Sequence, residues 1–223
     1  MDVLDRANAL LAEYAALALS ELPAGADLFD VHTHLGLDID GMTGELDELL
    51  DVQRSYAISR SFVFCLDEPD RHPGFRAAND RTLAHAARSG GALLPFVRLD
   101  LNESPLEEAL RCLDQGARGI KLHPRAQSFL PDDPRLKPVF ELAADRRVPI
   151  LMHGGRGLPP IADGLARLLD RHAPPALIVA HAGIVDLAAM ARNFSGRPGV
   201  FFDTSVWSPL DLLDLYRLVS PEQ

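Results

Sequence analysis

The amino-acid sequence predicts an α/β fold in which short strands alternate with helices along almost the whole chain. Short apolar runs recur along the sequence, and glycine, proline or polar residues bound each of them. Several runs are apolar at consecutive positions, which is typical of parallel strands that are buried on both faces. The expected strands are 28–34, 61–66, 92–100, 119–123, 148–153, 176–181 and 200–204.

Helix-start signals lie between these runs. Ser104 and Glu107 have the spacing of a capping box, in which the serine is the N-cap. Ser208 and Asp211 repeat this layout after the seventh run, and Asp133 precedes another expected helix. Seven strand–helix units in succession imply parallel strands joined by crossover helices, in either a closed barrel or an open doubly wound sheet.

Histidines at strand ends distinguish between these two arrangements. No glycine-rich dinucleotide motif follows the first strand, so that version of the open sheet loses support. His32 and His34 share one face at the end of the first strand, and His153 and His181 end the fifth and sixth. A barrel gathers these strand ends at the face where barrel active sites lie. We therefore predict a (β/α)8 TIM-barrel type with seven βα units visible.

The same histidines predict a metal site. Two imidazoles spaced by two residues on a strand, as His32 and His34 are, can chelate one divalent cation. Small residues follow His153 and His181, which leaves space above those strand ends. A lone strand-end histidine is more often bonded to a backbone carbonyl, but four of them at one end of three strands favour a metal centre.

Charged residues end the remaining strands. Lys121 and His123 lie on one face of the fourth strand, Arg98 and Asp100 end the third, and Asp203 ends the seventh. Lys121 has three interpretations: it binds an anionic substrate group, it is carboxylated and bridges two metal ions, or it forms an ion pair with Asp203 or Asp100.

Length and charge limit the class of protein. The 223 residues predict a single domain, 1–223, of which 1–26 form an N-terminal amphipathic helix and lead-in rather than a signal peptide. A formal net charge of −10 without basic clusters argues against nucleic-acid or membrane partners. Cys65 and Cys112 form no disulfide or metal pattern, which indicates reduced thiols and a cytoplasmic protein.

Four segments together resemble a known family. They are DVHTH (30–34), GIKLHP (119–124), MHGG (152–155) and AHAG (180–183). In this order they are similar to the amidohydrolase superfamily, specifically the amidohydrolase-related (amidohydrolase 2) group of metal-dependent TIM-barrel hydrolases. That group includes hydrolases, lactonases and nonoxidative decarboxylases. The resemblance implies one divalent metal ion, with zinc expected and manganese or iron as alternatives.

The resemblance also implies roles for individual residues. It makes His32, His34 and His153 metal ligands, and His181 a group that polarises the substrate or the attacking water. Lys121 and Asp203 join His181 as expected catalytic residues. The residues expected to bind an anionic substrate are Arg98, His123 and Arg125.

One element of the family pattern is absent. These barrels end in an eighth strand that carries a metal-binding Asp, whereas this sequence stops at Gln223, after the seventh helix. We therefore expect a C-terminally truncated barrel, in which Asp203 lies one strand too early to replace that Asp. The seven-stranded polymerase-and-histidinol-phosphatase group and the TatD-like deoxyribonucleases fit less well. The first usually ends in Asp-x-His, and the second has a Glu after strand four, where this chain has Lys121-Leu122-His123.

Three functions follow as hypotheses. The first is a metal-dependent hydrolase that uses metal-activated water on a C–O or C–N bond of a small anionic substrate. The second is a nonoxidative decarboxylase of an aromatic or unsaturated carboxylic acid. The third is a non-catalytic truncated barrel that retains a metal site. The expected partners are a small-molecule substrate and, as a possible assembly, a second copy in a homodimer.

Overall fold

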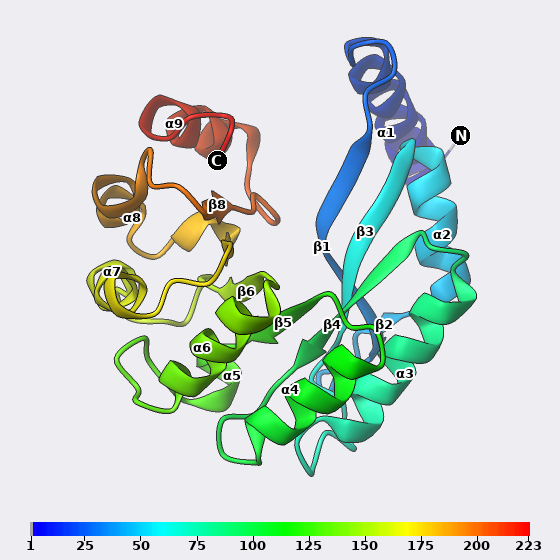
Figure 1. Ribbon diagram of the computed structural model, residues 1–223. Coiled ribbons are helices and arrows are strands. Elements are labelled where there is room, and N and C mark those ends of the chain that lie inside the picture. The colour runs from blue at the N-terminus through cyan, green and yellow to red at the C-terminus, as the bar shows by residue number, and fades with distance from the viewer. Residues whose placement is uncertain (1) are drawn as a thin grey trace.

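A computed structural model describes residues 2–223, and its centre is one curled sheet of eight strands (Figure 1). Seven strands are parallel and follow one another in chain order across the sheet, as the sequence predicts. The eighth, β2 (Thr43–Gly44), pairs antiparallel with the first. The parallel strands are β1 (Leu28–Leu37), β3 (Ile58–Cys65), β4 (Leu93–Arg98), β5 (Gly119–Leu122), β6 (Ile150–His153), β7 (Leu177–Ala180) and β8 (Val200–Phe202).

Helices surround the outer side of this sheet (Figure 1). A short 3-10 helix, η1 (His181–Gly183), follows β7 directly. The α-helices are α1 (Val3–Ser20), α2 (Leu46–Ser55), α3 (Arg76–Arg88), α4 (Pro105–Asp114), α5 (Pro124–Gln127), α6 (Leu136–Arg146), α7 (Ala162–Arg171), α8 (Leu187–Phe194) and α9 (Pro209–Leu218). Within residues 2–223, no helix has the length and apolar character that crossing a bilayer requires.

The sheet curls far enough to bring its two ends together. β1 and β8 lie at opposite ends of the parallel strand order and are not hydrogen-bonded to each other. His32, within β1, nevertheless contacts Asp203, the residue after β8. The backbone N–H of Phe202 donates to the carbonyl of Gln223 at 2.6 Å, so the last described residue lies along the edge of β8. The described part of the chain therefore has the TIM-barrel type predicted from the sequence, with seven parallel strands and no eighth.

Apolar side chains fill both faces of the strands. Ile120 and Ile150 point outward into the largest apolar cluster, where helix residues such as Phe140 are fully buried. Phe64 and Phe96 belong to a second, inner cluster, with ring centroids 6.5 Å apart. Because each such side chain contributes about 1.5–3 kcal/mol when it leaves water, consecutive apolar residues stabilise these strands. This two-faced burial is the physical reason for the uninterrupted apolar runs in the sequence.

The helix-start predictions have different outcomes. Ser208 and Asp211 form the predicted capping box at the start of α9. Ser104 precedes α4 as predicted, but its φ of 50° is not the extended backbone of a capping residue, and its side chain makes no cap hydrogen bond. The prediction of a helix directly after Asp133 is also wrong by two residues. Asp133 closes a turn with the N–H of Leu136, where α6 begins.

Candidate metal centre

The alternation of β1 places two imidazoles on the inner side of the curled sheet. Thr33, between them, points the other way and donates to the carbonyl of Phe62 at 2.6 Å. The Nε2 atoms of His32 and His34 lie 3.1 Å apart. Two nitrogens bound to one tetrahedral zinc at 2.0–2.1 Å would be about 3.3 Å apart. The observed spacing is therefore suitable for chelation of a single ion by this pair.

A carboxylate orients one of these rings. The carboxylate of Asp203 accepts a short hydrogen bond from His32 Nδ1, and both side chains are almost fully buried. With its proton on Nδ1, His32 has a free lone pair on Nε2, the atom that faces His34. Asp203 also accepts hydrogen bonds from the N–H and hydroxyl of Ser205, at 2.7 and 3.1 Å. Burial opposes ionisation of Asp203, but these hydrogen bonds, first that from His32, lower its pKa to about 2.

Two further imidazoles come from the ends of β6 and β7. The ring centroids of His153 and His181 are 4.9 Å apart, and those of His181 and His32 are 5.0 Å apart. Gly155 permits this approach, because a Cβ there would lie 2.6 Å from His181 Cδ2 and 2.7 Å from His153 Cε1. Ser205 again provides support, since its Oγ lies 2.9 Å from His181 Nδ1.

The donor set fits a divalent cation. One ligand atom from each of His32, His181 and Asp203 lies within 4.8 Å of the other two. His153 Nε2 is buried without a hydrogen-bond partner in the described part of the chain, a condition that a metal ion would relieve. Two imidazoles and a carboxylate, with two further imidazoles beside them, are ligands that zinc accepts.

All these imidazoles are neutral near pH 7. Burial is the main cause: it lowers the pKa of His32 to about 4 and that of His153 to about 3, and nearby Lys121 adds to both shifts. Burial also lowers the pKa of His34 and His181. Because neutral imidazole is the form that binds metals, the site is electrostatically prepared for a cation.

Lys121 comes from β5, the neighbour of the strand that carries His153, and lies against Phe64, whose ring also packs on His34. Its side chain is fully buried, and its Nζ lies 4.3 Å from the ring centroid of Phe64. Burial lowers its pKa well below the usual value, and Arg98 nearby has the same effect. Between residues 2 and 223, no carboxylate lies within ion-pair distance of it, although the charge of Asp203 partly offsets this lowering of its pKa.

The other predicted site residues divide into two groups. His123 stacks on His153, with ring centroids 3.9 Å apart, and accepts a hydrogen bond from the N–H of Ala126. Arg98 is buried under the ring of Phe75, with its guanidinium 3.5 Å from Asp67. The structure thus brings His123 to the histidine cluster and leaves Arg98 beneath the surface. Asp100 is engaged in a local turn, where it accepts two hydrogen bonds from Asn102.

A cavity of about 330 Å³ opens beside the histidines. The predicted residues Arg125, His153 and His181 line it. Arg156 and Val206 also line it and were missed by sequence reasoning, as was Ser205. Their positions carry a signal that could have found them, because Arg156 directly follows the strand-end motif MHGG, and Ser205 and Val206 are the first two residues after FFDT.

A curled parallel sheet with histidines and a carboxylate at its strand ends defines a (β/α)-barrel of the metal-binding type. The family model described as amidohydrolase (Amidohydro_2) matches residues 29–221, and the chain belongs to this family. Its members are metal-dependent enzymes, among them hydrolases and lyases. This confirms the family resemblance inferred from the four sequence motifs. No curated protein matches the sequence.

Solved structures share the fold at low sequence identity. An amidohydrolase II is 19% identical with a TM-score of 0.67, over 88% of this chain and 84% of its own. A probable 2-pyrone-4,6-dicarboxylic acid hydrolase from Acinetobacter baumannii is 12% identical with a TM-score of 0.62, over 88% and 74%. The 4-oxalomesaconate hydratase of Rhodopseudomonas palustris is 16% identical with a TM-score of 0.62, over 87% and 78%.

Proposed function

We propose that this chain is a metal-dependent hydrolase that acts on a C–O or C–N bond of a small anionic substrate. The observation that carries the proposal is the pair of Nε2 atoms of His32 and His34, 3.1 Å apart, with the His32 ring held by Asp203. A buried ring nitrogen on His153 without a partner in the described structure supports it. The ring nitrogens of these histidines face one another, and the hydrogen bonds of the described residues leave His153 Nε2 without a partner, so a cation can bind there.

Zinc is the proposed metal, because imidazole nitrogens and one carboxylate suit it, with manganese or iron as alternatives. His32, His34 and His153 would hold the ion, as the family resemblance implies. His181 and Asp203 lie beside this set, since each has a possible ligand atom within 4.8 Å of one on His32. A bound divalent ion would lower the pKa of a water molecule toward neutrality and polarise a carbonyl or ester group.

Side chains of the protein would transfer the proton and orient the metal-binding His32. His181 lines the cavity as a neutral imidazole, which can accept a proton from the attacking water and return it to the leaving group. Asp203 is a positioning residue, since its low pKa makes it a weak proton acceptor but a strong partner for His32. Ser205 links the two by hydrogen-bonding both Asp203 and His181.

Cationic groups near the cavity favour an anionic substrate. Arg125 lies at the cavity, exposed to solvent, and Arg156 lines the same space. Lys121 adds a buried positive centre within the barrel whenever it is protonated. The structural relative from Acinetobacter baumannii is described with a dicarboxylic acid substrate and with citric acid bound, which supports the same class of substrate here.

The same cations also suit a second reaction, nonoxidative decarboxylation of an aromatic or unsaturated carboxylic acid. In that case the substrate carboxylate would itself occupy the metal-binding position, and Lys121 would lie close to the bond that breaks. Hydrolysis remains the first choice, because His181 and Ser205 form a proton-transfer pair beside the cavity.

We also propose a single cytoplasmic domain. Cys65 and Cys112 are both free and buried, which suits a reducing compartment. The proposed residues all lie on strands of one sheet or within a few residues of their ends, which is consistent with a site inside one domain.

Metal content measured together with turnover tests the proposal. Purified protein should contain about one zinc per chain, whereas a His32→Ala/His34→Ala variant should contain almost none. A His172→Ala variant is the matched control, because His172 lies outside both groups of possible metal ligands and faces Glu141. Wild-type protein that takes up no zinc, manganese or iron would overturn the metal site.

Turnover then separates the reactions. The loaded protein is offered lactones, esters, amides and unsaturated carboxylic acids, with carbon dioxide release recorded beside hydrolysis. Hydrolysis that depends on metal supports the first proposal, and carbon dioxide release replaces it with the second. Full metal occupancy without either reaction on an anionic panel would indicate the non-catalytic alternative.

A further inference from the structure

The N-terminal helix α1 is the least buried long element of the structure. None of its 18 residues is buried, and only Ala15 and Leu19 are half-buried. Helices of this kind are stabilised mainly by packing of an apolar face, so an 18-residue helix with no covered face is unusual. The apolar residues of α1 are therefore exposed without a packing partner among the described residues.

Its exposed apolar residues follow a regular spacing. Val3, Ala7, Leu10 and Tyr14 are separated by four, three and four residues, which is the spacing of a helix that packs along another helix. Val3 is 84% exposed, Leu10 52% and Tyr14 64%. Leu4 and Leu11 border this stripe on one side, and both are also exposed.

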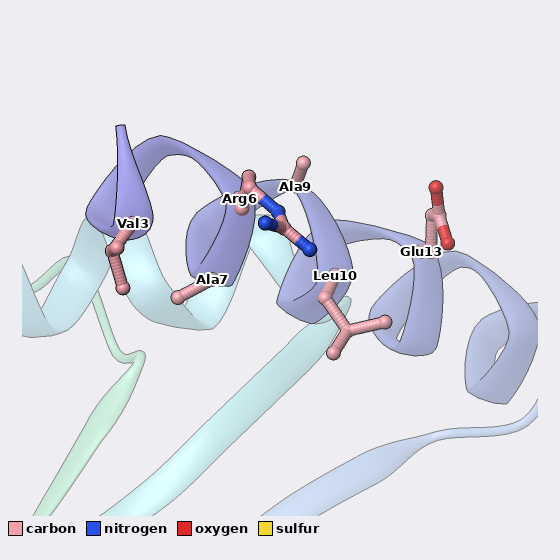
Figure 2. Close-up of a pocket in the computed structure, with 6 residues that line it drawn as sticks. All are labelled: Val3, Arg6, Ala7, Ala9, Leu10 and Glu13. Carbon is pink, nitrogen blue, oxygen red and sulfur yellow. The ribbon is translucent and has the colours of Figure 1, made fainter. Parts of the chain in front are cut away.

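Charges of opposite sign border the stripe on its other side. Arg6 and Glu13 are seven residues apart, about two turns, and within residues 2–223 neither forms an ion pair. Figure 2 shows Val3, Ala7 and Leu10 on one side of the helix, with the Arg6 side chain beside Leu10 and Glu13 directed away from them. The six residues drawn there, all from α1, line an open hollow of about 530 Å³.

We propose that this stripe binds the same stripe of a second copy of the chain, with the two α1 helices antiparallel about a two-fold axis. Ala7 then packs against the partner's Leu10, and Tyr14 against the partner's Val3. In this register Arg6 faces the partner's Glu13, and the axis repeats that pair.

The positions of Arg6 and Glu13 favour the antiparallel arrangement of the two α1 helices over a parallel one. In a parallel pair the flanking Arg6 would face the partner's Leu11, and Glu13 would face the partner's Ala18, so no ion pair would form. In the antiparallel pair Leu4 also meets the partner's Leu11, which buries both exposed leucines. The overlapping residues 3–14 span about 18 Å, so the interface is small and the dimer exchanges with monomer.

The other exposed apolar helix, α9, lacks this self-complementarity. It exposes Leu210, Leu213 and Tyr216, but its Arg217 already pairs with Asp214 within the helix. Its Asp211 is engaged in the capping box at its first turn. α9 therefore offers apolar area without free charges that would define a partner's orientation.

Sedimentation over a wide range of protein concentration tests the proposal. The wild-type mass should rise from the 24.3 kDa monomer toward twice that value. R6E and E13R each replace two ion pairs with two like-charge pairs, and should weaken the dimer about tenfold. The double variant R6E/E13R exchanges the charges, and it should restore the wild-type dissociation constant.

Controls keep the result specific. R217E makes the same change of charge on another exposed helix and should leave the dimer unchanged, and circular dichroism should confirm that every variant remains folded. Wild-type protein that remains monomeric throughout would overturn the proposal. So would a dimer that R6E does not weaken, or one that the double variant fails to restore.

Discussion

The two sides of the candidate site differ in how their ionisable side chains are paired. On the side of β1 and β8, polar groups are connected to one another: Asp203 bonds His32 and Ser205, and Ser205 bonds His181. On the side of β5, Lys121 is fully buried against the ring of Phe64, and Arg98 and Asp203 act on its pKa in opposite directions. One side has a carboxylate and imidazole lone pairs, and the other has a buried amine with a lowered pKa that forms no ion pair among the described residues.

This difference indicates what each side binds. Lone pairs oriented by a carboxylate favour a cation, because hydrogen bonding fixes the ring and leaves a nitrogen free. A buried ammonium without a carboxylate partner is costly and persists where an anion or a reaction uses it. The comparison predicts that changes on the histidine side alter metal binding, and that changes on the cationic side alter substrate binding.

Asp203→Asn should produce the largest effect on metal affinity, because Asp203 is the carboxylate that hydrogen-bonds His32. The amide keeps the shape of the carboxylate but removes the charge that holds His32 Nδ1–H. Loss of such a supporting group typically weakens metal affinity by about 10–100-fold. Competition with a metal-sensitive dye measures this, and the metal-dependent reaction should decline in parallel. Asp170→Asn, at an exposed ion pair with Arg197, is the control. Unchanged affinity in Asp203→Asn would mean that the carboxylate does not orient the ligand.

Much of the fold could be predicted from the sequence because its pattern is local. A run such as 176–181 is apolar at nearly every position, and burial on both faces of a parallel sheet is the simplest physical reason for that. The start of α4 shows the limit of this reasoning. Whether Ser104 can cap depends on its backbone, and its φ of 50° results from a chain path that the motif does not encode.

The site could be predicted only in part. His32 and His34 are close in sequence, so β-strand alternation alone brings them together. The contact between His32 and Asp203 joins the two ends of the sheet, and it depends on how far the sheet curls. No local pattern gives that curvature, so the sequence named Asp203 as a catalytic residue but could not predict its contact with His32.

Lys121→Met should have a smaller effect, and one of opposite kind. Methionine has a similar length and no charge, so the variant removes a buried cation without leaving a cavity. The free energy of unfolding should rise by about 1–2 kcal/mol, because no ion pair is lost. Metal content should stay unchanged, whereas turnover of an anionic substrate should fall. Chemical denaturation and metal analysis on the same preparation measure both. A less stable protein would show that Lys121 has a compensating partner in solution.

Arg125→Ala should have the smallest effect, and it tests the cationic side at its exposed edge. The guanidinium lines the cavity but is exposed to solvent, so water and salt screen its attraction for a substrate anion. We expect KM to rise about threefold to tenfold with kcat nearly unchanged, and the free energy of unfolding to change by less than about 0.5 kcal/mol. The difference in KM between wild type and variant should shrink as salt is added. Arg118→Ala is the matched arginine control, because this exposed residue directly precedes β5, at the end of the strand remote from Arg125. If KM responds equally to both variants, the positive charge at the cavity does not select the substrate, and the contrast between the two sides rests on Lys121 alone.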